Sequence, residues 1–138
     1  MKNYLDSGKS LYIEGNDLFR DLQSTSLFDY LGARYLGDGE GVWVGNISSL
    51  RGVDGSIAQG LAFSFPQWGH PDEKPDQIEA SEKGRLLLVS QDGVGRMVSD
   101  DGHQPYRLIA SSVAWGALKP NETPPDLLLQ KILDYLIR

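Results

Sequence analysis

The segment that most constrains this chain is residues 11–22, where a short apolar strand leads directly into a helix. Apolar residues in 11–15 predict the strand, and the apolar spacing in 18–22 predicts the helix. In α/β enzymes such a corner holds a nucleophile or an anion, because the first helical N–H groups lack backbone partners and the helix dipole is positive there. Here the corner carries Asp17, which can cap the helix but is a poor nucleophile and repels anions. The corner therefore indicates architecture more than activity.

The first residues of the chain predict the end of a helix. Residues 4–8 are typical of a last helical turn closed by a glycine in the left-handed conformation. A helix of one turn is marginal, because nucleation orders several residues before hydrogen bonds accumulate. We therefore expect residues 1–138 to be a single domain that is a fragment of a larger protein, with further elements before Met1. The alternative is a frayed N-terminal tail of a complete domain.

The remaining pattern changes from helix to β structure and back to helix. Residues 24–32 predict a helix that ends at Gly32, and Pro124 and Pro125 begin a last helix with a regular apolar stripe. Residues 48–83 are predicted to be largely irregular, with a long surface loop around three prolines. The segments predicted as strands are 33–36, 42–44, 60–65, 85–90, 94–99 and 106–113.

Charge and residue usage exclude several classes of function. The 138 residues include 13 Lys and Arg against 19 Asp and Glu, a formal net charge of −6, which disfavours binding to nucleic acid. Cysteine is absent, which excludes disulfides, thiolate catalysis and cysteine-based metal sites. No apolar run approaches the roughly 20 residues that span a bilayer, and no leader follows Met1. We therefore expect neither a membrane segment nor a signal peptide in this chain.

Acidic residues and histidines supply the candidates for catalysis or metal binding. Asp17 with Glu14 at one strand end could hold a cation or act as acid and base, but capping and solvation explain both more simply. Asp100, Asp101 and His103 could bind a metal, but their spacing does not match a calcium loop and favours a polar turn. We therefore predict no metal site and no cofactor.

Aromatic residues supply the candidates for ligand binding. Trp68 and His70 share a predicted loop and could line a pocket with Trp115, although a loop residue without such a role is the simpler interpretation for His70. Trp43, Trp68 and Trp115 could stack on sugar rings if exposed, but tryptophan is more often part of a core. A G-x-S-x-G elbow is absent, which argues against serine catalysis.

Several runs of residues resemble one known family. Residues 4–17, YLDSGKSLYIEGND, are similar to the Y-L-x-x-G-G-x-L-x-I-x-G-x-D segment of class I glutamine amidotransferase-like domains embedded in large secreted bacterial and archaeal proteins. Residues 28–33 followed by Tyr35 resemble the F-x-x-Y-L-G-A-x-Y helix exit of that family, and Ile57 with residues 60–61 resembles its I-x-x-G-L step. Residues 107–118 and 132–136 are similar to its closing strand and helix. In that family a strand and a helix precede the first motif, in agreement with an excised domain.

The resemblance also bears on catalysis. Active amidotransferases of this fold place a cysteine at the strand-to-helix corner and a histidine near the last strand, because a thiolate paired with a base attacks an amide readily. Here the cysteine position corresponds to Asp17, and residues 112–116 contain no histidine. The resemblance thus implies a non-catalytic member without catalytic residues.

These observations lead to one expected architecture. We predict a three-layer α/β domain with a mainly parallel sheet, an antiparallel extension and flanking helices, an incomplete amidotransferase-like or flavodoxin-like fold. The expected function is that of a non-enzymatic accessory or interaction domain in a larger secreted or cell-surface prokaryotic protein. Its expected partners are neighbouring domains, another protein, or a second copy that pairs along an open sheet edge.

Two alternatives come from other functional classes. One is a hydrolase-like enzyme that uses Asp17 with His70 or His103, and it predicts a histidine within hydrogen-bond reach of Asp17 in a cleft. The other is a carbohydrate-binding module that uses exposed tryptophans, and it predicts a row of coplanar indole rings on the surface.

Overall fold

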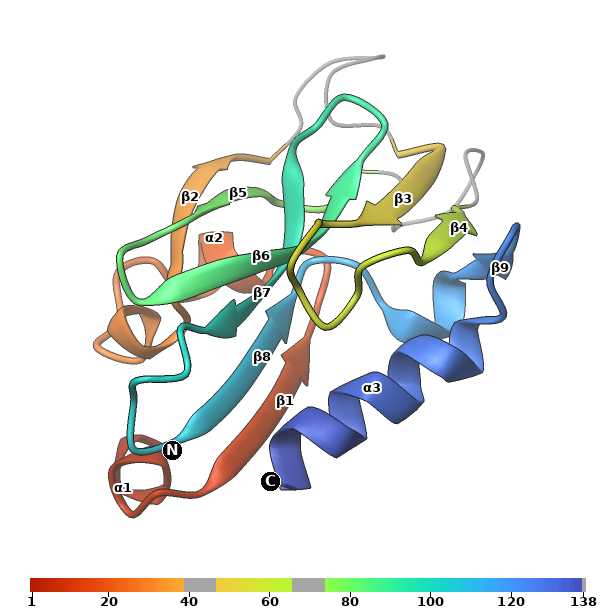
Figure 1. The fold of residues 1–138 in the computed structure, drawn as a ribbon. Helices are drawn as coiled ribbons and strands as arrows, with labels where there is room; N and C mark the ends of the chain where they lie inside the picture. The colour runs from red at the N-terminus through yellow and green to blue at the C-terminus, as the bar shows by residue number, and fades with distance from the viewer. Residues whose placement is uncertain (39–46, 66–73, 138) are drawn as a thin grey trace.

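The computed structural model describes residues 1–38, 47–65 and 74–137 of the chain, and a sheet of nine strands dominates this part (Figure 1). The strands are β1 (Ser10–Glu14), β2 (Ala33–Gly37), β3 (Ser49–Gly52), β4 (Ala62–Ser64), β5 (Gln77–Ala80), β6 (Gly84–Ser90), β7 (Gly95–Asp100), β8 (Arg107–Ser111) and β9 (Lys119–Pro120). The α-helices are α1 (Lys2–Asp6), α2 (Leu18–Leu22) and α3 (Pro125–Ile137), with 3₁₀ turns at Phe28–Tyr30 and Trp115–Ala117.

The sheet is mixed but largely antiparallel, and it curls strongly into a half-barrel (Figure 1). Its strand order is β1-β8-β7-β6-β3-β4-β9, while β5 pairs with both β7 and β2. Among the described strands only β1 and β8 pair in parallel, with Ser10 opposite Arg107 and Glu14 opposite Ser111. The prediction of a three-layer, mainly parallel sheet is therefore wrong.

Short connections explain the antiparallel pairing. β6 and β7 are joined by a tight turn in which Gly93 has a φ of 81°, a left-handed conformation that glycine adopts without a steric penalty. A parallel pair needs a crossover of a dozen or more residues, and the connections between β3 and β4, β6 and β7, and β7 and β8 are too short for one.

The central strands are buried on both faces, which is why their sequence looks like that of a parallel sheet. One core cluster lies between the sheet and α3 and contains Leu88, Met97, Ile109, Leu128 and Ile132. A second cluster lies on the other face with α1 and α2 and contains Leu5, Phe19, Val98, Leu108 and Ala110. Successive residues of β7 and β8 thus enter different cores, which produces continuous apolar runs in an antiparallel setting.

Several local predictions are confirmed. The strand before the corner spans Ser10–Glu14, the last helix begins at Pro125, and a short helix precedes Gly8, whose φ is 76°. Within residues 48–83, β4 confirms the strand predicted at 60–65, but β3 and β5 lie in segments predicted to be irregular. β2 pairs with β5, and the strand predicted at 42–44 lies outside the described residues.

No helix in the described ranges has both the length and the apolar character that crossing a bilayer requires.

Candidate functional site

The strand-to-helix corner joins β1 to α2 through residues 15–17. The Gly15 amide donates to the Ser111 carbonyl at 3.0 Å, which extends the parallel ladder, and the Leu18 amide donates back to the Gly15 carbonyl at 3.1 Å. Asp17 stands at the N-cap position of α2, but its side chain makes no capping hydrogen bond. The expectation that Asp17 caps this helix is therefore wrong.

Asp76 supplies the cap instead. Its Oδ2 accepts hydrogen bonds from the amides of Phe19 at 2.8 Å and Arg20 at 2.9 Å. The two N–H groups belong to the first turn of the five-residue helix α2. Amides in the first turn have no acceptor within the helix, so the Asp76 carboxylate satisfies their hydrogen bonds. A carboxylate from elsewhere in the chain thus occupies the place that an enzyme of this design would leave for an anion.

The backbone amide and carbonyl of Asp76 are hydrogen-bonded as well as its side chain. Its amide donates to the Asn16 carbonyl at 2.9 Å, and its carbonyl accepts from the Ser112 hydroxyl at 2.8 Å. Asp76 is fully buried, with an exposed fraction of 0%. The residue therefore connects the corner after β1 to the chain that follows β8.

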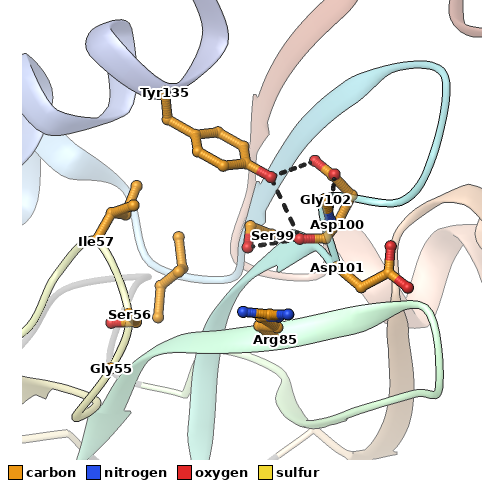
Figure 2. A pocket seen from close by; sticks show the side chains of 10 residues that line it. Gly55, Ser56, Ile57, Arg85, Ser99, Asp100, Asp101, Gly102 and Tyr135 are labelled. Carbon is orange, nitrogen blue, oxygen red and sulfur yellow. Dashed lines mark hydrogen bonds between the residues drawn. The ribbon is translucent and has the colours of Figure 1, made fainter. Parts of the chain in front are cut away.

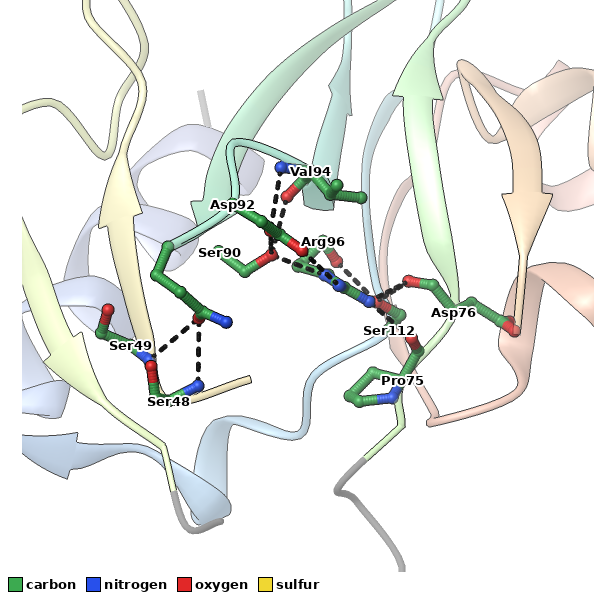
Figure 3. Close-up of polar contacts among 10 residues, drawn as sticks. Ser48, Ser49, Pro75, Asp76, Ser90, Asp92, Val94, Arg96 and Ser112 are labelled. Carbon is green, nitrogen blue, oxygen red and sulfur yellow. Dashed lines mark hydrogen bonds and ion pairs between the residues drawn. The ribbon is translucent and has the colours of Figure 1, made fainter. Parts of the chain in front are cut away.

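A buried arginine completes this polar layer. The Arg96 side chain has an exposed fraction of 0%; its Nε donates to the Ser90 hydroxyl at 3.0 Å and its Nη1 to the Pro75 carbonyl at 2.6 Å. Figure 3 shows the guanidinium of Arg96 between the β6–β7 turn and the segment at Pro75 and Asp76. The guanidinium also forms a long ion pair with Asp92, with Nη2 3.9 Å from Oδ2. Burial lowers the pKa of Arg96, while the charge of Asp92 opposes this shift.

Three carboxylates meet beside the corner. One oxygen from each of Asp17, Asp38 and Asp76 lies within 4.8 Å of the others. Arg20 pairs with two of them, through Nη2 to Asp17 Oδ2 at 3.0 Å and Nη1 to Asp38 Oδ2 at 2.6 Å. Burial raises the pKa of Asp76 to about 6, because loss of water outweighs the two amide hydrogen bonds. We call these three residues the carboxylate cluster; their oxygen atoms are suited to a hard divalent cation.

The structure separates Asp17 from one predicted histidine partner. Asp17 follows the end of β1, whereas His103 precedes the start of the parallel strand β8. The five residues of β8 therefore separate Asp17 from His103 along the strand direction. At about 3.3 Å per residue this is a length of roughly 15 Å. His103 is exposed in the turn before β8, where its amide donates to Asp101 Oδ1 at 2.9 Å. His70 and Trp68 lie outside the described residues.

Trp115 and Glu14 have structural partners. The Trp115 indole Nε1 donates to the Pro125 carbonyl at 3.0 Å, and its amide donates to Glu14 Oε2 at 2.8 Å. Trp115 is half-buried and packs against the core cluster that contains α3. These contacts join the ends of β1 and β8 to the start of α3.

A small pocket lies beside α3. A pocket of about 140 Å³ is lined by Arg85, Tyr135, Asp100 and neighbouring residues (Figure 2). The Tyr135 hydroxyl donates to Asp100 Oδ1 at 2.7 Å, and Arg107 stacks 5.2 Å from the centre of the Tyr135 ring. Asp100 Oδ1 also accepts from the Leu108 amide at 2.8 Å, so this buried carboxylate holds the turn before β8. The pocket is small, and its polar groups bond mainly to one another.

Three residues that organise the corner, Asp38, Asp76 and Arg96, were not predicted from the sequence. Asp38 belongs to a glycine-rich stretch typical of a solvated turn, and Asp76 follows a proline in a segment predicted to be a loop. Arg96 directly precedes the apolar pair Met97 and Val98 in β7, and this charged residue in a central strand is a signal that could have indicated a polar layer.

Comparisons with known proteins identify no relative. No protein-family model matches the chain, and a search of curated proteins finds no significant match.

Proposed function

We propose that this chain is a non-enzymatic accessory or interaction domain that binds a neighbouring module or another protein along the open edge of β1. The observation that carries the proposal is that β1 ends the strand order and pairs, within the described residues, with β8 alone. An open strand edge offers a row of N–H and C=O groups to an extended segment of a partner.

The alternation of the parallel ladder identifies the groups on this edge. The Gly15 amide bonds to β8, so the backbone groups of Leu11 and Ile13 face β8 as well. Those of Ser10, Tyr12 and Glu14 consequently face the open side. The Ser10 carbonyl accepts from the Tyr4 hydroxyl at 3.1 Å, which leaves Tyr12 and Glu14 as the residues offered for pairing.

Exposed apolar side chains accompany the start of this edge. Tyr4 is 48% exposed and its hydroxyl reaches Ser10, whose own hydroxyl donates to the carbonyl of Leu136 in α3. Beside Leu136, Ile137 is 81% exposed, and Leu133 one turn earlier is 48% exposed. Apolar side chains next to an open edge would add buried area to the backbone pairing.

The corner chemistry supports a non-enzymatic domain. The free N–H groups of α2 already hold the Asp76 carboxylate, and Asp17 is paired with Arg20. A substrate anion would have to displace a buried carboxylate of the protein itself. The resemblance to amidotransferase-like domains and the expected place in a secreted protein remain predictions from the sequence.

Self-association of the isolated chain tests the edge, because a second copy presents the same strand. Two β1 strands related by a two-fold axis through Tyr12 would place Ser10 opposite Glu14 of the other copy. We expect dimers in size-exclusion chromatography with light scattering as concentration rises. The double substitution Leu133→Asp and Ile137→Asp should weaken dimerisation at least about tenfold by adding like charges to the interface.

Leu127→Asp is the matched control, because Leu127 is also an exposed leucine of α3, at 37%, but lies near the opposite end of the helix from Ser10. It should leave the dimerisation constant unchanged. A chain that stays monomeric at high concentration, or a dimer that both sets of substitutions weaken equally, would contradict pairing along β1.

A further inference from the structure

We propose that the carboxylate cluster of Asp17, Asp38 and Asp76 is a binding site for a divalent cation, with Ca²⁺ as its ligand. The three residues come from the end of β1, the end of β2 and the start of β5. A cation at their centre would cross-link three segments that are distant in sequence.

The spacing of the oxygen atoms fits one ion. An oxygen from each carboxylate lies within 4.8 Å of the other two. Calcium binds oxygen atoms at about 2.3–2.6 Å, so oxygens on opposite sides of the ion are up to about 5 Å apart. The three carboxylates can therefore contact one ion without a large movement of the backbone.

A buried acceptor without a partner points to a ligand at this place. Asp76 is fully buried, and Figure 3 shows its side chain directed away from Arg96. Oδ2 of Asp76 receives two amide hydrogen bonds, but Oδ1 receives none from the described residues. The amide oxygen of Asn16, which adjoins Asp17, is buried in the same unpartnered state. A buried carboxylate oxygen without a donor is costly unless a cation or a proton compensates it.

The local charge also favours a divalent ion. Arg20 supplies one positive charge against three carboxylates and pairs with Oδ2 of Asp17 and Oδ2 of Asp38. Arg20 is 41% exposed, so its guanidinium can shift toward Asp21, 3.6 Å away, when a cation binds.

Ca²⁺ suits this site better than Mg²⁺. The donors are carboxylates on three separate segments, an irregular set rather than a rigid octahedron. Calcium accepts six to eight oxygens in flexible geometry, whereas magnesium demands near-ideal octahedral coordination and gives up water reluctantly. Water would complete the coordination from the exposed side of Asp17 and Asp38.

Calorimetric titration of the full chain with CaCl₂, after removal of metal by a chelator, tests the proposal. We expect one saturable site and a midpoint of thermal unfolding that rises with calcium concentration. Asp38→Asn should weaken calcium binding by about tenfold or more, because ligand charge sets the affinity of such sites. Asp21→Asn is the matched control: Asp21 also contacts Arg20 but lies outside the cluster, and its removal should change affinity by less than about twofold.

Amide chemical shifts of the unmodified protein locate the ion without any substitution, which keeps the test decisive if Asp38→Asn fails to fold. Calcium should shift the amide signals of Asn16, Asp17, Asp38 and Asp76 most strongly. Absence of a saturable response at millimolar calcium, equal weakening by Asp21→Asn and Asp38→Asn, or shifts centred on Asp100 and Asp101 would each overturn the proposal.

Discussion

At the scale of single residues, the interior of this protein is organised by two buried charged side chains. Asp76 caps α2 from 57 residues away, and Arg96 joins the β6–β7 turn to the backbone at Pro75. Buried charges are expensive unless their hydrogen bonds are satisfied, and removal of one partner leaves the others without compensation. Removal of a hydrogen-bond partner of either residue should therefore cost more than removal of a surface ion pair.

Arg96→Met should destabilise the fold strongly. The substitution keeps an unbranched side chain but removes the donors that Ser90 and the Pro75 carbonyl receive. We expect a loss of about 3–5 kcal/mol in the free energy of unfolding, measured by urea denaturation. Arg34→Met is the control, because Arg34 pairs with Glu79 on the surface with its side chain 65% exposed. Its effect should stay below about 1 kcal/mol, and equal effects would show that Arg96 is not a structural centre.

The titration of Asp76 should appear in the pH dependence of stability. Burial raises the pKa of Asp76 from 3.8 to about 6, so the folded state binds this proton more tightly than the unfolded state. The contribution of Asp76 to the free energy of unfolding is therefore full below about pH 4 and is lost as pH rises through about 6, a change of about 3 kcal/mol.

Asp76→Asn removes this titration while it keeps an oxygen for the α2 amides. With a chelator present, urea denaturation at several pH values should show the unfolding free energy of the parent protein falling relative to that of Asp76→Asn between pH 4 and pH 6. A constant difference between the two proteins across that range would mean that Asp76 has an ordinary pKa.

At the scale of elements, the ends of two strands approach neighbouring backbone too closely for any residue but glycine. Gly52 at the end of β3 lies against the chain at Ala58, where an added Cβ would stand 1.6 Å from the Ala58 carbonyl oxygen. Gly84 at the start of β6 similarly meets Gly32, with an added Cβ 1.9 Å from its carbonyl oxygen. Neither glycine has a positive φ. Glycine is therefore required at both positions because a Cβ atom would clash with the neighbouring carbonyl oxygen, and not because of the backbone conformation.

Gly52→Ala should force the backbone near Ala58 to move. We expect a loss of about 1–3 kcal/mol, the usual cost of overpacking, in thermal or urea unfolding. Gly116→Ala is the control, because an added Cβ at Gly116 meets no atom within 4 Å. If the two substitutions have the same effect, the segments at Gly52 and Ala58 are not in close contact in solution.

At the scale of the whole molecule, one curled sheet separates two cores and leaves β1 at its edge. α3 covers one face and α1 with α2 the other, while β7 and β8 contribute side chains to both cores. The two cores therefore share their central strands and should support each other. The same arrangement places the carboxylate cluster at the carboxyl end of β1 and the proposed contact surface along that strand, so a partner at the edge and an ion at the corner would act on one element.

The sequence by itself determined the local elements whose signals are local. Gly8 and Gly93 adopt the left-handed conformations that their turns require, Pro125 begins α3, and the strand Ser10–Glu14 leads into α2 as predicted. Such features depend on backbone sterics and on side-chain periodicity within a few residues. Only the tertiary structure decided how strands distant in sequence pair, because burial on both faces gives antiparallel strands the apolar runs expected of parallel ones. It also decided which carboxylate caps α2, since Asp76 reaches the helix only when the sheet has folded, and a contact across 57 residues leaves no trace in any local pattern.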